Sequence, residues 1–94
     1  MKKHETVIIL KPDLTEEEKN TVVQSITDKI NEKGKIEGEI NKKEQQLAYE
    51  IKGYNKGYYI DFQFDMQTSV VKEIEIFLRS NQNVIKYIIV GVVE

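Results

Sequence analysis

The chain has 94 residues, of which 39% are hydrophobic and 32% are charged, a composition typical of a single globular domain. It contains no cysteine and no apolar run near the roughly 18 residues of a membrane span, so neither a disulfide-rich secreted protein nor a membrane protein is indicated. Its 14 basic and 16 acidic residues give a formal net charge of −2, whereas a freestanding nucleic-acid binder is usually strongly basic. We therefore expect one cytoplasmic domain over residues 1–94, in which any contact with RNA comes from a local patch.

The first two predicted elements are a buried strand and a capped helix. Residues 5–10 are β-branched and apolar and are followed by a proline, which predicts a strand buried on both faces or nearly so. Thr15 and Glu18 have the spacing of an N-terminal capping box. Apolar residues then recur at helical spacing, at Val22, Val23, Ile26 and Ile30. With Gly34 as a stop signal, the pattern predicts a helix over residues 15–33.

Two strands joined by a turn come next. Residues 35–50 predict a second strand with an irregularity, because the alternation of its first part gives way to a polar run. Glycine and asparagine residues mark a turn around Tyr54. Residues 57–65 alternate aromatic and polar side chains, which indicates a half-buried third strand antiparallel to the second.

A second helix and a last strand complete the pattern. Thr68 or Ser69 is the expected N-cap of the helix, and residues 84–93 form the expected strand. The apolar stripe of the helix consists of Val70, Val71, Ile74, Phe77 and Leu78. The order βαββαβ predicts an α+β, ferredoxin-like fold: a four-stranded antiparallel sheet with two helices on one face and the other face open.

Residues with catalytic or metal-binding chemistry are few. The five glycines never reach the spacing of a phosphate loop, and His4 is the single histidine of a chain without cysteine, so we expect no cofactor and no metal. Acidic residues 16–18 fit the positive end of a helix dipole better than acid catalysis. Among the aromatic residues, we expect most of Phe62, Phe64 and Phe77 to pack in the core. The chain lacks the aromatic signature of an RNA-recognition sheet, so its tyrosines are assigned to core or interface packing.

Several phrases, in order along the chain, resemble the bacterial small-subunit ribosomal protein six family. They are Met1-Lys2-Lys3-His4-Glu5, Pro12-Asp13-Leu14, Gln46-Leu47-Ala48-Tyr49-Glu50-Ile51, Gly57-Tyr58-Tyr59, Leu78-Arg79, Asn83-Val84 and Lys86. The chain departs from the family where basic residues are common, at Glu44, Gln45, Asn81 and Gly91. These departures indicate either a reduced RNA footprint or a relative with an altered role, and we favour the reduced footprint.

The resemblance implies a structural, non-enzymatic component of the small ribosomal subunit with a role in translation. It implies binding to small-subunit ribosomal RNA jointly with ribosomal protein eighteen, and no membrane or small-molecule partner. A basic partner would supply the positive charge that this chain lacks. Two alternatives stay open: a small ferredoxin-like ligand-binding or regulatory domain that dimerises through its sheet, and an acylphosphatase-type enzyme. For the enzyme, residues 10–14 lack the required arginine-bearing phosphate loop.

Candidate contact residues follow from their expected positions. The predicted RNA-binding residues are Lys2, Lys3, His4, Arg79 and Lys86. The predicted partner-binding residues are Tyr49, Tyr58 and Tyr59. We expect the RNA-binding residues to form a split surface, because strands one and four are not expected to be adjacent at the centre of the sheet. Arg79, the one arginine of the chain, is the best candidate for a bidentate phosphate contact, with pairing to the carbonyls at its helix end as the structural alternative.

Overall fold

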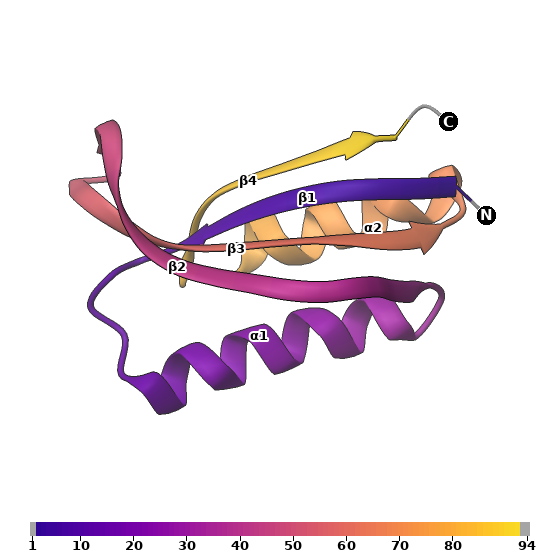
Figure 1. Cartoon of the computed structure of the whole chain (residues 1–94), viewed down its shortest axis with the longest axis horizontal. Coiled ribbons are helices and arrows are strands. Elements are labelled where there is room, and N and C mark those ends of the chain that lie inside the picture. The colour runs from indigo at the N-terminus through magenta and orange to yellow at the C-terminus, as the bar shows by residue number, and fades with distance from the viewer. Residues whose placement is uncertain (1, 93–94) are drawn as a thin grey trace.

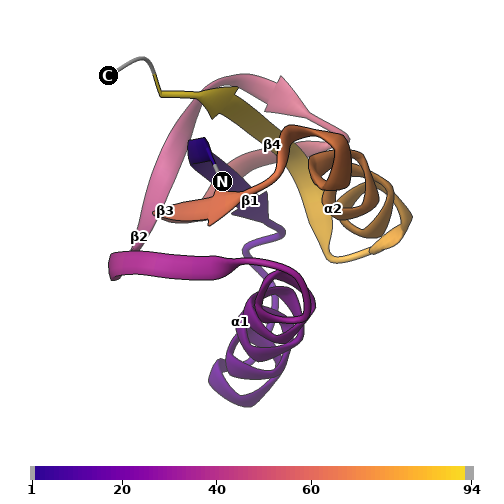
Figure 2. The same ribbon diagram turned by 90° about the vertical axis from the view of Figure 1, so that its right-hand side faces the viewer.

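The computed structural model describes residues 2–92 as a four-stranded antiparallel sheet with both helices on one of its faces (Figures 1 and 2). The elements are β1 (Lys2–Leu10), α1 (Glu16–Asn31), β2 (Lys35–Ile51), β3 (Tyr54–Met66), α2 (Thr68–Ser80) and β4 (Val84–Gly91). The sheet order is β2-β3-β1-β4, so α1 carries the chain across β3 and α2 carries it across β1. The predicted ferredoxin-like fold is confirmed. Neither helix, within the residues described, is long and apolar enough to cross a membrane.

The pairing of the strands corrects one expectation. β1 pairs with β3 on one side and with β4 on the other, so strands one and four are direct neighbours. The reason is the path of α2, which returns the chain to the far side of β1 and makes β4 an edge strand. β1 also begins at Lys2, earlier than predicted, because its pairing with β3 continues to Met66. The predicted end of the last strand, residue 93, lies outside the described residues.

The hairpin between β2 and β3 turns two residues earlier than predicted. Ile51 pairs with Tyr54, and the turn between them consists of Lys52 and Gly53, with φ angles of 50° and 85°. Two positive φ angles in a two-residue loop are typical of a type I′ turn, which matches the twist of the strands it joins. The expected position of the turn, around Tyr54, is therefore wrong: the turn is at Lys52 and Gly53, and Tyr54 is the first residue of β3.

Helix α1 begins as predicted, and α2 does not. The Thr15 hydroxyl accepts a hydrogen bond from the Glu18 N–H at 3.1 Å, and the Glu18 carboxylate accepts one from the Thr15 N–H at 3.0 Å. This reciprocal pair confirms the capping box. The N-cap of α2 is Gln67, which makes no side-chain capping hydrogen bond, so the prediction of a cap at Thr68 or Ser69 is wrong. Because β3 extends to residue 66, the helix begins directly after the strand.

The core lies between the helices and the sheet. Residues alternate along β1, so that His4, Thr6, Ile8 and Leu10 are buried under the helices while the residues between them face the open side. Phe62 and Phe64 are buried in this core, as predicted, and Phe77 is partly buried against it. The predicted irregularity of β2 is also present, as a register shift between Glu37 and Asn41. The open face, which no helix covers, is therefore the surface available for contacts.

Candidate functional site

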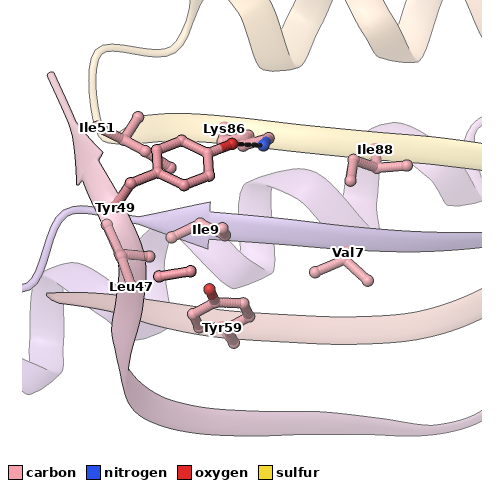
Figure 3. Close-up of a pocket in the computed structure, with 9 residues that line it drawn as sticks. Val7, Ile9, Leu47, Tyr49, Ile51, Tyr59, Lys86 and Ile88 are labelled. Carbon is pink, nitrogen blue, oxygen red and sulfur yellow. Dashed lines mark hydrogen bonds between the residues drawn. The ribbon is translucent and has the colours of Figure 1, made fainter. Parts of the chain in front are cut away.

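One end of the open face carries an apolar groove, shown in Figure 3. It has a volume of about 190 Å³. Its apolar lining comes from all four strands and includes Val7, Ile9, Leu47, Ile51, Tyr59 and Ile88. Ile9 and Leu47 are almost fully buried, whereas Ile88 keeps 48% of its surface exposed. The groove therefore has a packed floor and an accessible apolar rim.

The curl of the β2–β3 hairpin creates this groove. Figure 3 shows the end of β2 crossing above the sheet toward β4. The pairing of β2 with β3 is irregular between Gln46 and Ile51, which allows this bend. Gly57 lies beneath the bend, and a Cβ atom there would contact the Ile9 Cγ2 atom and come within 3.5 Å of Leu47 Cδ2. Position 57 therefore requires glycine for the hairpin to pack onto β1.

A tyrosine–lysine pair joins the hairpin to the edge strand. The Lys86 Nζ atom donates a hydrogen bond to the Tyr49 hydroxyl at 3.0 Å and lies 5.4 Å from the centre of its ring (Figure 3). The hydrogen bond and the charge of Lys86 lower the pKa of Tyr49, and the same hydrogen bond raises the pKa of Lys86. Tyr49 is nevertheless 64% exposed, so its ring is available to a second molecule.

Next to the groove, the open face is acidic. Gln63 on β3 is paired with Glu5 on β1 and with Glu37 on β2, which places the two glutamates on either side of it. Asp61, two residues before Gln63 on β3, accepts a hydrogen bond from the Asn41 side-chain amide at 2.9 Å. These carboxylates line one depression, which we call the acidic patch, with Glu39 as a further member. Such a surface repels phosphate and attracts a basic partner.

The predicted RNA-binding residues lie at two ends of the sheet. Lys2 and Lys3 open β1, while Lys86 is paired with Ile9 near the end of the same strand. At about 3.3 Å per residue, Lys3 and Ile9 are about 20 Å apart. The surface is split along the strands and not, as expected, by a separation of β1 from β4. Arg79 lies in the last turn of α2, and it lines a depression together with Lys86.

His4 occupies a different environment from the other predicted RNA-binding residues. Its side chain is 4% exposed, and its ring stacks on Phe64 with 5.3 Å between ring centres. A buried ring cannot reach RNA without unfolding the start of β1. We therefore do not assign His4 to the RNA contact.

The three predicted partner-binding tyrosines are divided between the two faces. Tyr49 and Tyr59 line the apolar groove. Tyr58 lies on the helix side, where the Lys19 Nζ atom is 4.5 Å from the centre of its ring. Our sequence interpretation missed the apolar residues of the groove, although the unbroken apolar runs at residues 7–10 and 87–90, which put apolar side chains on both faces of β1 and β4, were a usable signal.

Within residues 2–92, no three or more His, Cys, Asp or Glu side chains are arranged to hold a metal ion. The geometry instead provides surfaces: an apolar groove, an acidic patch beside it, and cations at the two ends of the sheet. These are features of a protein that binds other macromolecules.

Comparison with known proteins identifies the family. A sequence model of ribosomal protein S6 matches residues 3–91. The small ribosomal subunit protein bS6 of Campylobacter jejuni is 37% identical over 91 residues, which cover 96% of this chain and 73% of that protein. The bS6 protein of Moorella thermoacetica is 32% identical over 93 residues, covering 95% and 92% of the two chains. The crystal structure of 30S ribosomal protein S6 from Thermotoga maritima superposes with a TM-score of 0.91 at 28% identity, covering 97% of this chain and 87% of that one. The resemblance seen in the sequence is thus confirmed, and the chain belongs to the ribosomal protein S6 family of the small ribosomal subunit.

Proposed function

We propose that this protein is a structural, non-catalytic component of the small ribosomal subunit that binds small-subunit ribosomal RNA jointly with ribosomal protein eighteen. The observation that carries the proposal is the division of the open face into an apolar groove and an adjoining acidic patch. Together these surfaces fit a protein partner that is basic and presents apolar anchors.

The charge distribution supports a joint mode of binding. The formal net charge is −2, and the acidic patch lies on the open face beside the groove, so RNA alone meets repulsion there. A basic partner seated on the patch would neutralise it and add its own cations to the surface. Lys2 and Lys3 at one end, with Arg79 and Lys86 at the other, then contact phosphates on either side of the partner.

The groove provides the anchoring contacts of the partner. Tyr49 and Ile88 are among the most exposed large apolar residues described, at 64% and 48%, and both line the groove. Tyr59 lies across the floor from them. Aromatic side chains in such a position are typical centres of binding energy in protein interfaces. We assign Tyr49 and Tyr59 to the partner interface.

Filter binding of small-subunit ribosomal RNA, with and without ribosomal protein eighteen, tests the proposal. We expect weak binding by this protein alone and much tighter binding with the partner present. The chain offers a matched pair of variants, because Ile88 in the groove and Ile76 on α2 are equally exposed, at 48% and 47%. Ile88→Ser removes apolar area from the interface and should weaken the joint complex about tenfold. Ile76→Ser should leave it unchanged.

Equal affinity for RNA with and without the partner would contradict joint binding. Equal effects of the two serine variants would show that the groove is not where the partner binds.

A further inference from the structure

Three cations from three separate segments line one depression at the beginning of β4. Lys52 comes from the β2–β3 turn, Arg79 from the last turn of α2, and Lys86 from β4 itself. The depression has a volume of about 220 Å³, and no carboxylate lines it. We call it the basic pocket.

The basic pocket lies at the edge of the sheet, and residues from both faces of the sheet line it. Ile85 and Lys86 belong to the open side of β4, and Tyr87 belongs to the helix side, yet all three line the pocket. The curled hairpin brings Lys52 to this edge, since Figure 3 shows Ile51, the preceding residue, beside the start of β4. The end of α2 brings Arg79 from the other side. The fold thus assembles the pocket from positions 27 and 34 residues apart in sequence (52 to 79 and 52 to 86).

The cations of the pocket are available to a ligand. Across residues 2–92, neither Lys52 nor Arg79 forms an ion pair with a carboxylate. In the same part of the chain, Arg79 donates no side-chain hydrogen bond to the carbonyls of its helix end, so its N–H donors are available to a ligand. Lys86 donates one hydrogen bond, to the Tyr49 hydroxyl. Because an ammonium group has three N–H donors, two remain for a ligand.

The backbone of Lys52 is a second, independent indication. Its φ of 50° lies in the left-handed region, which glycine and asparagine occupy readily and which lysine does not. Lys52 is the single non-glycine residue with positive φ in the described part of the chain. A charged residue held in this sparsely populated backbone region motivates the hypothesis that its side chain has a functional role.

We propose that the basic pocket binds a phosphate group, held by Lys52, Arg79 and Lys86. The planar fork of Arg79 suits two phosphate oxygens, and the two ammonium groups add charge-assisted hydrogen bonds. The inference deepens the proposed function, since the RNA backbone is one source of phosphate and a free phosphate ion is the other. It adds Lys52 to the contact residues and predicts one shared site instead of separate contacts.

The test uses a variant that separates binding from folding. Lys52→Asn creates Asn-Gly, a preferred pair for a type I′ turn, so the melting temperature should stay the same or rise while the charge is lost. Lys56→Gln is the matched control, because it removes one charge from the same hairpin at an exposed position outside the pocket.

The first arm measures RNA binding with ribosomal protein eighteen present over a range of salt concentrations. Loss of one phosphate contact should reduce the slope of log affinity against log salt by roughly 0.7–0.9 in Lys52→Asn. The second arm titrates each protein with inorganic phosphate and follows the backbone amide NMR signals of residues 52, 79 and 86. These signals should shift in wild type and in Lys56→Gln, and much less in Lys52→Asn.

A reduced salt slope in Lys52→Asn alone supports a pocket for an RNA phosphate. A phosphate-dependent shift without any effect on RNA supports a pocket for a free anion. If Lys52→Asn behaves like Lys56→Gln in both arms, the pocket is not a phosphate site. If wild type itself fails to bind RNA with the partner, the proposed function is wrong. The phosphate titration then still tests whether the basic pocket binds phosphate.

Discussion

Replacing Gly57 by alanine tests how the hairpin forms the apolar groove. The new methyl group would overlap the Cγ2 methyl of Ile9, which is attached directly to a β-branched carbon and cannot swing away without changing χ1. Leu47 Cδ2, at 3.5 Å, closes the other side. Ile9 must therefore leave its rotamer, or the hairpin must lift from β1.

The size of the effect follows from two opposing terms. Overpacking of a buried site costs about 1–3 kcal/mol. Replacing glycine by alanine where φ is not positive returns about 0.4–1 kcal/mol by restricting the unfolded chain. We expect a net loss of about 1–2 kcal/mol in the free energy of unfolding. For a domain of this size, that lowers the melting temperature by roughly 4–8 °C for each kcal/mol lost.

A double-mutant cycle isolates the contact. Ile9 is 6% exposed, so Ile9→Ala alone should cost about 2–4 kcal/mol through the cavity it leaves. In Gly57→Ala/Ile9→Ala the added methyl enters that cavity, and the double variant should be at least about 1 kcal/mol more stable than additivity predicts. Urea unfolding followed by far-ultraviolet circular dichroism measures all four proteins, since the chain has no tryptophan. Effects that add within about 0.5 kcal/mol would refute the account of the groove floor.

Two further predictions concern single groups. Thr15→Ala should lower the free energy of unfolding by about 1 kcal/mol, because it removes the side-chain half of the capping box. The hydrogen bond from the Thr15 N–H is the main cause that lowers the pKa of Glu18 from its ordinary value of 4.5, so the folded state has the lower pKa. The stabilisation is therefore present above the pKa that Glu18 has in the unfolded chain, and it is lost as the pH falls through the pKa of the folded state. The difference in free energy of unfolding between wild type and Glu18→Gln should shrink below about pH 4. A difference that stays constant with pH would contradict this. His4→Phe should raise the free energy of unfolding by about 1 kcal/mol, because within residues 2–92 the buried Nδ1 atom of His4 has no hydrogen-bond partner. A phenylalanine ring can keep the stacking on Phe64. A melting temperature below that of wild type would contradict this prediction.

Local signals in the sequence predicted local structure well. The capping box at Thr15 needs only its own turn, and the alternation around Phe62 and Phe64 needs only its own strand, so both were readable. The turn at Lys52 was missed because its left-handed backbone is unfavourable for lysine. His4 was predicted to contact RNA, yet β1 starts at Lys2 and carries it into the core.

The surfaces were less predictable than the fold, because tertiary structure assembles them. Tyr49 and Tyr58 lie nine residues apart, in the two neighbouring phrases that resemble the family. The bend of β2 places Tyr49 at the groove, whereas Tyr58 lies under α1. Lys52 from the hairpin and Arg79 from α2 line one depression with Lys86. No spacing along the chain predicts that these three residues are close together. The apolar run at residues 7–10 of β1 was an overlooked signal, since Val7 and Ile9 belong to the open face and line the groove.

Whether this protein is a stable part of the small ribosomal subunit can be measured directly by quantitative mass spectrometry of 30S particles. The particles are purified from the cells that make the protein, after a high-salt wash that removes loosely bound proteins. We expect the chain to remain in stoichiometric amount with the other small-subunit proteins. Its recovery in the free protein pool, with 30S particles that lack it, would show that it is not a stable part of the subunit.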